Sequence, residues 1–213
     1  MNVLELFAGS CSFSNMAKEL GHNTYSIDIE PYEDVDLQAD ILSLKFNKIP
    51  FQPDVIWCSP PCTSFSVSSI GCHWTGGKGA YIPKTSRAYL GMALVKRSIE
   101  FIEYFKPKYW YIENPRGVLR KLDLVKDLPL KTICFCKYGD RRMKPTDIWT
   151  NDDKWIPQPM CKNGATLRGE CHHEPAPRGS KTGTQGMKNA YFRAILPDLL
   201  CWEILTGLER RIS

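Results

Sequence analysis

Apolar and polar positions alternate along the chain in a pattern that predicts five short strands. These strands are expected at residues 2–7, 24–29, 54–58, 109–113 and 131–137. Helical spacing of apolar residues predicts helices at about 12–20, 86–105 and 118–122. Since strands alternate with helices, we expect an α/β fold with a mostly parallel, Rossmann-like sheet and helices on both faces.

The pattern divides the chain into three parts. Residues 1–150 carry the alternating strands and helices of a core. Residues 151–188 are rich in proline and glycine and have little apolar periodicity, which predicts a small irregular insert. Residues 189–213 return to a helix-compatible pattern, so we expect a C-terminal helix that packs back on the core.

Composition indicates a globular protein and argues against a membrane protein. Of 213 residues, 43% are hydrophobic and 24% are charged. No apolar run approaches the roughly 20 residues that span a bilayer, and no signal peptide is evident. Nine cysteines, an odd number, favour reduced thiols and a cytoplasmic location over a disulfide framework.

Charge is distributed unevenly along the chain. Residues 1–60 hold three lysines and nine acidic residues, a net charge of −6. Residues 131–193 hold twelve basic and six acidic residues, a net charge of +6. A basic second half suits a polyanion such as nucleic acid, although a solvated basic face without a partner gives the same pattern.

Small residues follow the first predicted strand, and acidic residues stand at the end of the second strand and shortly after it. The first strand runs into Phe7-Ala8-Gly9-Ser10-Cys11-Ser12-Phe13, a turn that lets the backbone approach a ligand closely. Asp28 ends the second strand, where a carboxylate can accept hydrogen bonds from ribose hydroxyls. Asp40-Ile41 stands where a loop could cover an adenine ring. Together they favour a nucleoside-containing cofactor over a plain tight turn with surface acids.

A cysteine follows the third predicted strand. Residues 54–58 run into Ser59-Pro60-Pro61-Cys62, and the two prolines fix the backbone as it leaves the strand. This places Cys62 at the carboxyl edge of the sheet, where open α/β sheets bind ligands. A thiolate there is a strong nucleophile. The alternative is a buried structural cysteine, which is our interpretation of Cys58.

These motifs, taken in order, resemble the cytosine-C5 DNA methyltransferase family. The resemblance rests on Phe7-Ala8-Gly9 with Phe13, on Pro61-Cys62 with Phe65-Ser66, and on Glu113-Asn114, and it spans residues 1–149. It implies the Rossmann-like fold of S-adenosylmethionine-dependent methyltransferases. It also implies DNA as substrate, as in a restriction system or a phage.

The resemblance implies a role for each matched residue. Cys62 would attack C6 of cytosine, and Glu113 would contact N3 and the exocyclic amine. Arg142 and Lys144 would hold the cytosine and a nearby phosphate. The loop of residues 63–85 would close behind a flipped base. The implied cofactor contacts are Phe7, Ala8, Gly9, Cys11, Ser12, Asp28, Ile29, Asp40, Ile41, Ser59, Pro61 and Asn189.

The chain departs from the family pattern at several positions. Cys11 and Ser12 stand where two glycines are usual, and Asp28 stands in place of Glu. Lys144 replaces an arginine and cannot reproduce its bidentate hydrogen bonding. Pro115 and Lys188 replace Val and Gly. These changes leave the reacting groups in place but bear on the fit of the cofactor and the base.

The insert of residues 151–188 takes the place of a large target-recognition domain. Its stretch Arg178 to Gln185 offers donors for phosphates or base edges and is our candidate DNA-recognition loop. The spacing Cys-x9-Cys-His-His matches no established zinc-finger spacing, so we predict reduced cysteines and no metal, with zinc as the alternative. The residues concerned are Cys161, Cys171, His172 and His173.

Three other functions are compatible with the same motifs. The first is cytosine-5 methylation of RNA by an enzyme of the same fold. The second is a non-catalytic DNA-binding relative, which the presence of Cys62, Glu113 and the Arg142/Lys144 pair disfavours. The third is methylation of free cytosine nucleotides, suggested by the small insert.

Overall fold

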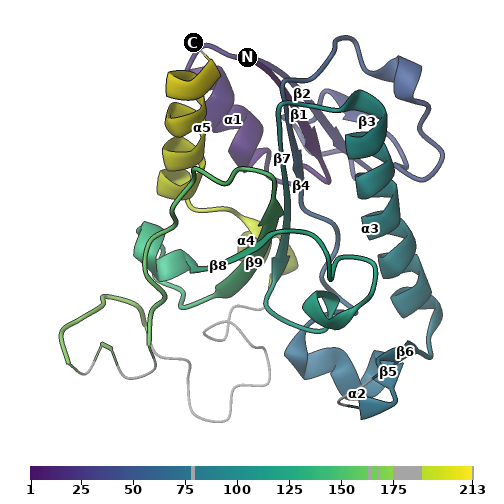
Figure 1. Ribbon diagram of the computed structural model, residues 1–213, viewed down its shortest axis with the longest axis vertical. Helices are drawn as coiled ribbons and strands as arrows, with labels where there is room; N and C mark the ends of the chain where they lie inside the picture. The colour runs from purple at the N-terminus through teal and green to yellow at the C-terminus, as the bar shows by residue number, and fades with distance from the viewer. Residues whose placement is uncertain (78–79, 163–164, 167, 175–188, 213) are drawn as a thin grey trace.

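A single large sheet organises the part of the chain that the computed structural model describes (Figure 1). That part comprises residues 1–77, 80–162, 165–166, 168–174 and 189–212. The sheet has seven strands in the order β3-β2-β1-β4-β7-β9-β8. Their bounds are β1 Asn2–Leu6, β2 Asn23–Asp28, β3 Leu37–Gln38, β4 Val55–Cys58, β7 Tyr109–Pro115, β8 Leu130–Cys134 and β9 Pro145–Thr150.

The sheet confirms the predicted Rossmann-like architecture. The neighbours β3, β2, β1, β4 and β7 all pair in parallel, in the order expected of a doubly wound sheet. At the other edge, β9 inserts between β7 and β8 and is antiparallel to both. Since β9 runs against β7, the residues just before β9 lie beside the carboxyl end of β7.

Helices cover both faces of the sheet, as expected (Figure 1). On one face, α1 (Ser12–Glu19) packs against α5 (Asp198–Ile212), and on the other lies α3 (Ser86–Phe105). Successive strand residues point to opposite faces, so each strand feeds two cores. The core under α1 and α5 contains Val3, Val55, Trp57 and Tyr111, and the core under α3 contains Leu4, Leu6, Ile56 and Ile112.

The structure differs from the predicted elements in several places, among them the short strand β3, which was not predicted. The helix expected at 118–122 is a short 3-10 helix, η4 (Leu119–Lys121). The strand expected at 131–137 ends at Cys134, and the chain continues as the 3-10 helix η5 (Phe135–Tyr138), closed by Gly139 at φ 85°. The expected C-terminal helix is two, α4 (Ala190–Ala194) and α5, because Pro197 separates them. Strand β9 was not predicted, since Thr146 and Asp147 interrupt its apolar pattern.

The predicted loop of residues 63–85 contains short elements. It holds the 3-10 helix η2 (Val67–Ser69), helix α2 (Ile70–His73) and the hairpin β5 (Trp74–Thr75) with β6 (Ile82–Pro83). Trp74 anchors it, because its buried indole donates a hydrogen bond to the Ser64 carbonyl at 2.6 Å. The remaining short helix, η1, covers Phe46–Lys48.

Residues 151–174 follow β9 without forming a helix or a strand at any described position. The candidate recognition stretch from Arg178 to Gln185 lies outside the described residues. In the part of the chain that is described, no helix has the length and apolar character needed to cross a membrane.

Candidate active site

The turn after β1 takes an unusual backbone conformation. Phe7, Gly9 and Cys11 have φ values of 59°, 51° and 53°, in the left-handed region that favours glycine. The Gly9 amide donates a hydrogen bond to Asp28 Oδ2 at 2.8 Å, which ties the turn to the end of β2. A Cβ added at Gly9 would meet no atom within 4 Å. The backbone at Gly9 is therefore open to a ligand.

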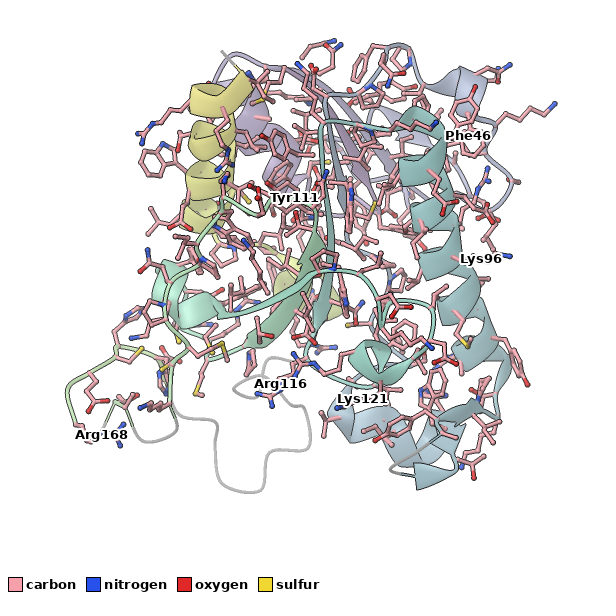
Figure 2. The ribbon with its side chains drawn as sticks, in the orientation of Figure 1. Phe46, Lys96, Tyr111, Arg116, Lys121 and Arg168 are labelled. Atoms are coloured by element: carbon pink, nitrogen blue, oxygen red, sulfur yellow. The ribbon has the colours of Figure 1, made fainter. Side chains whose placement is uncertain are left out.

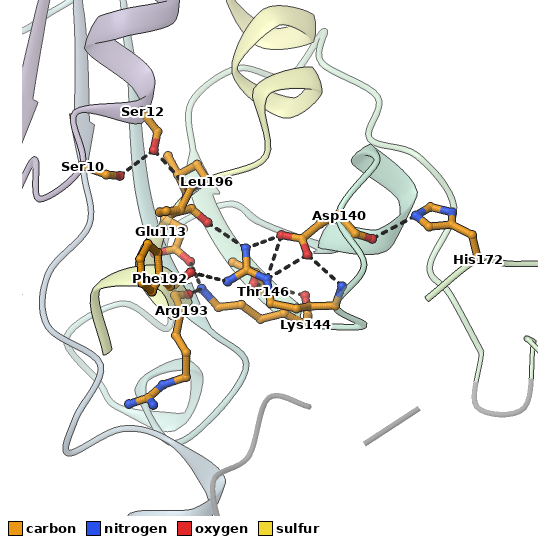
Figure 3. Close-up of polar contacts among 12 residues, drawn as sticks. Ser10, Ser12, Glu113, Asp140, Lys144, Thr146, His172, Phe192, Arg193 and Leu196 are labelled. Atoms are coloured by element: carbon orange, nitrogen blue, oxygen red, sulfur yellow. Dashed lines mark hydrogen bonds and ion pairs between the residues drawn. The ribbon is translucent and has the colours of Figure 1, made fainter. Parts of the chain in front are cut away.

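Cys11 and Ser12 occupy the start of α1 in different ways. The Cys11 side chain is fully buried, and burial raises the pKa of its thiol to about 11. Its access to a ligand is therefore through its backbone. Ser12 Oγ lies 2.7 Å from Ser10 Oγ and accepts a hydrogen bond from the Leu196 amide at 3.3 Å (Figure 3). Ser12 thus joins the turn after β1 to the C-terminal segment.

The next predicted cofactor residues lie at the end of β2 and after β2 and β3, strands that run parallel to β1. Both Asp28 oxygens accept backbone hydrogen bonds, from Gly9 and, at 2.9 Å, from Glu30. Ile29 follows with 60% of its surface exposed. Asp40 is exposed and caps the Leu42 amide at 3.0 Å, whereas Ile41 is buried in the core under α3.

The remaining predicted cofactor residues are spread over three segments. Ala8 is buried and Phe7 is half-buried in the turn after β1. Ser59 accepts a hydrogen bond from the Trp57 indole at 2.8 Å, and Pro61 is exposed beside it. Asn189 caps α4, where its side chain accepts the Tyr191 amide hydrogen at 2.9 Å. Tyr191 in turn contacts the ring of Tyr32, in the loop after β2.

Cys62 lies in a loop that is fixed at both ends. Asn114 Nδ2, at the end of β7, donates a hydrogen bond to the Pro60 carbonyl at 2.8 Å. After the cysteine, the Phe65 amide donates to the Cys62 carbonyl at 2.9 Å. Cys62 is half-buried. Burial raises the pKa of this thiol, the positive charge of Lys144 lowers it, and the negative charge of Glu113 raises it.

Glu113 and Lys144 form the buried charged pair beside Cys62. Lys144 Nζ lies 3.6 Å from Glu113 Oε1 and donates a hydrogen bond to the Arg193 carbonyl at 3.1 Å (Figure 3). Among the described residues, Glu113 Oε1 and Asn114 Oδ1 are buried without a hydrogen-bond partner. Burial raises the pKa of Glu113, and the Lys144 charge opposes that shift. Buried acceptors without a hydrogen-bond donor call for an explanation, and a bound substrate would supply the donor.

Arg142 is buried, and its guanidinium binds groups of the chain itself. It pairs with Asp140, to which Arg142 Nε donates at 2.8 Å. It also donates to the Phe192 carbonyl at 2.8 Å and the Ile195 carbonyl at 3.1 Å. The structure therefore brings Cys62, Glu113 and Lys144 together, while Arg142 holds the C-terminal end of α4.

Two residues of the site were not found from the sequence. Arg193, on α4, lies near enough to Cys62 for its charge to lower the pKa of the thiol. It is far from the motifs in sequence, so only the fold reveals it. Glu5 is buried beneath α1, where it accepts the Ser14 amide hydrogen at 2.8 Å, and burial raises its pKa to about 7. A buried acid inside an apolar strand was a signal that the sequence offered.

The arrangement defines a class of protein: an α/β protein in which a cysteine, a buried acid and a lysine lie near one another at the carboxyl edge of a Rossmann-like sheet. No known family profile matches the chain. A protein of Frog virus 3 (isolate Goorha) named "Probable DNA (cytosine-5)-methyltransferase" is 31% identical over 165 residues, covering 74% of each chain. The chain belongs to the DNA (cytosine-5)-methyltransferase family.

More distant relatives were also found. The type II methyltransferase M.DdeI of Desulfomicrobium norvegicum is 28% identical over 148 residues, which cover 60% of this chain and 32% of that protein. Among solved structures, an E. coli prophage protein described as a DNA modification methyltransferase has 16% identity and a TM-score of 0.49. Spodoptera frugiperda DNMT2 has 20% identity and a TM-score of 0.43. Each alignment covers 76% of this chain, which spans about half of each solved chain (52% and 56%).

Proposed function

We propose that this protein transfers a methyl group from S-adenosylmethionine to C5 of a cytosine in DNA, with Cys62 as its nucleophile. The observation that carries the proposal is the convergence of Cys62, Glu113 and Lys144. They come from the loop after β4, the end of β7 and the residue before β9, three places that the sheet order makes adjacent. Membership of the family supports the same chemistry.

The turn after β1 and the end of β2 suit S-adenosylmethionine. The open space at Gly9 admits a ligand against the backbone, Asp28 retains lone pairs for ribose hydroxyls, and exposed Ile29 offers an apolar surface to adenine. We assign further contacts to the backbone or side chains of Phe7, Ala8, Cys11, Ser12, Asp40, Ile41, Ser59, Pro61 and Asn189. When bound, the cofactor supplies an electrophilic methyl group to C5.

Cytosine C5 is a weak nucleophile until a group adds to the ring. In the proposed reaction the Cys62 thiolate forms a bond to C6, and the electron pair of the C5–C6 double bond becomes available at C5. Burial raises the pKa of Glu113, which favours uptake of a proton, and in this step Glu113 donates that proton toward N3 as charge builds up on the ring. After C5 takes up the methyl group, a base removes the C5 proton and Cys62 leaves, which restores the double bond.

Lys144 and Arg142 have different tasks in this proposal. The Lys144 ammonium lies between Glu113 and the Arg193 carbonyl, where its charge favours the Cys62 thiolate and an electron-rich base. We assign Arg142 a positioning role instead of a contact with cytosine or phosphate. Its guanidinium holds Asp140 and the Phe192 and Ile195 carbonyls, and so fixes α4 beside Lys144.

DNA suits the surface around these groups. C5 and C6 lie within the base stack, so the cytosine must be flipped out to reach Cys62. In Figure 2, Arg116 and Lys121 lie toward the same end of the molecule as α2, the end to which the parallel strands point. Both side chains are exposed, which suits contacts to phosphates. The segment of residues 63–85 projects at this end and is our candidate for closing behind the flipped base.

Transfer of a labelled methyl group tests the proposal and separates it from its alternatives. The protein is incubated with methyl-labelled S-adenosylmethionine and, in parallel, unmethylated DNA, RNA or dCMP, followed by nucleoside analysis. We expect label only in 5-methyl-2′-deoxycytidine from DNA, with Cys72→Ser active and Cys62→Ser inactive. Cys72 is an exposed cysteine on α2 and serves as the matched control. Label in RNA or dCMP, or no label in any substrate, contradicts the proposal.

A further inference from the structure

Three cysteines and a histidine from two segments meet beside the active-site half of the sheet. They are Cys136, Cys161, Cys171 and His173, and their potential ligand atoms all lie within 4.8 Å of one another. Cys136 belongs to η5, and the others belong to the irregular segment after β9. We propose that these four side chains bind one zinc ion in a structural site. The proposal does not depend on the proposed function.

The distances suit a tetrahedral metal site. With Zn–S bonds of about 2.3 Å and a Zn–N bond of about 2.0–2.1 Å, tetrahedral ligand atoms lie roughly 3.5–3.8 Å apart. Cys161 Sγ and His173 Nδ1 are 3.6 Å apart. Pairs at the 4.8 Å limit need to close by about an ångström, a shift that side-chain rotation can supply.

The ligand set differs from the one that the sequence suggested. His172 is exposed, and its Nε2 lies 3.0 Å from the Asp140 carbonyl, so it points away from the cluster. The fourth ligand is Cys136, which precedes Cys161 by a whole strand and is brought close by η5. The proposed ligand set therefore contains Cys136 in place of His172, together with Cys161, Cys171 and His173. Three cysteines and one histidine form a recurring set for structural zinc.

The segment around these ligands is not held by regular secondary structure. At described positions, residues 151–174 form no helix or strand, and the small apolar cluster here consists mainly of the cysteines themselves with Ala165 and Met143. Cys136, Cys161 and His173 are buried although they contribute little apolar surface. A metal ion can fix such a segment because its binding free energy becomes folding free energy.

The cluster is connected to the active site through neighbouring residues. His172, next to His173, contacts the Asp140 carbonyl (Figure 3). Asp140 in turn pairs with Arg142. Arg142 then holds the α4 carbonyls beside Lys144. The zinc ion would therefore hold His173 and its neighbour His172, where the series of contacts that positions α4 begins. It would not contact the reacting atoms.

Metal content tests the site with matched variants. The wild-type protein, produced in zinc-supplemented medium and purified without a metal-affinity tag, is analysed by plasma mass spectrometry. We expect one zinc ion per chain, a loss of at least tenfold in His173→Ala and Cys171→Ser, and unchanged content in His172→Ala and Cys72→Ser. A zinc-free wild type, or full zinc content in His173→Ala, overturns the proposal.

X-ray absorption at the zinc edge tests the ligand set without any variant that could misfold. The wild-type protein should give three sulfur ligands at about 2.3 Å and one nitrogen ligand at about 2.0–2.1 Å. A shell made mainly of nitrogen and oxygen ligands, or one with fewer than three sulfurs, contradicts the assignment to these four residues. Neither measurement uses DNA or a methyl donor. The zinc proposal can therefore be overturned while the proposed function stands, and the proposed function can be overturned while the zinc proposal stands.

Discussion

The two halves of the active site are built by different means. Residues from β1, β2, β4 and β7 are placed by a parallel sheet whose strands end at one edge. Lys144, Arg142 and α4 are placed by side-chain contacts: the Asp140–Arg142 pair, the guanidinium bonds to carbonyls of the α4 region, and Lys144 bound to the Arg193 carbonyl. The first half therefore depends on backbone pairing, and the second depends on single buried charges.

This difference has a physical consequence. A substitution at the sheet edge removes a reacting group but leaves the hydrogen-bonded strands that support it. A substitution among the buried charges of the second half leaves a partner unpaired, and an unpaired buried charge is strongly destabilising. Substitutions in the first half should therefore lower activity with little loss of stability, whereas substitutions in the second half should lower both.

The largest expected effect is on activity, at Glu113 on the sheet edge. Glu113→Gln keeps the shape of the side chain but loses its acidic proton, so the methylation rate should fall roughly 10²–10⁴-fold. The midpoint of urea unfolding should fall less than in Arg142→Ala, because a glutamine amide oxygen can still face the Lys144 ammonium. Steady-state rates with DNA and equilibrium unfolding check both parts. A variant with nearly full activity would exclude Glu113 as the acid.

Arg142 tests the second half. Arg142→Ala leaves the Asp140 carboxylate and the α4 carbonyls without their donor, so we expect a loss of about 3–5 kcal/mol in the free energy of unfolding. The methylation rate of this variant should fall together with its stability. Arg141→Ala, at the neighbouring exposed arginine, is the matched control. Lost activity with unchanged stability would mean that Arg142 contacts the substrate instead.

Glu5 gives the sheet half its own pH dependence. Its pKa is about 7 in the folded protein and 4.5 for an unperturbed group, so the folded state binds the proton more tightly. Its stabilising contribution is therefore full below pH 4.5 and is lost as pH rises toward 7 and beyond, by about 3 kcal/mol in all. Glu5→Gln should remove this dependence, measured by urea unfolding from pH 5 to 8. The control Glu19→Gln, an exposed acid on α1, should retain it.

Lys144 joins the two halves, and its charge should have the smallest of these effects on the methylation rate. Its charge lowers the pKa of the Cys62 thiol, while burial raises it. Lys144→Met should therefore move the rise of the methylation rate with pH to more alkaline values, because the thiolate forms later. A pH–rate profile of both proteins checks the direction. An unchanged or more acidic profile would show that Lys144 does not act on Cys62.

Local sequence was sufficient to predict the regular half of the fold. Helix α3 was predicted with its observed bounds, and β1, β2, β4 and β7 within two residues, because apolar periodicity and buried runs mark them directly. Strand β9 was missed because its polar Asp147 is buried in a pair with Arg120. Only tertiary contact makes such a residue compatible with a central strand.

The candidate site shows the same division. Cys62 and Glu113 follow buried strands, so their places at one sheet edge could be argued from the sequence. The internal bonds of Arg142, the approach of Arg193 and the place of Cys136 beside Cys161 depend on how distant segments pack. Nothing in local periodicity carries that information.

Covalent trapping tests the central claim, that Cys62 attacks cytosine C6, most directly. In duplex DNA with 5-fluoro-2′-deoxycytidine in place of cytosine, the fluorine at C5 cannot be removed as a proton, so the enzyme stays attached after methyl transfer. We predict an adduct that survives denaturation, requires S-adenosylmethionine and maps to the peptide containing Cys62, in the wild type and in Cys72→Ser. No adduct in the wild type, or an equal adduct in Cys62→Ser, would contradict the account.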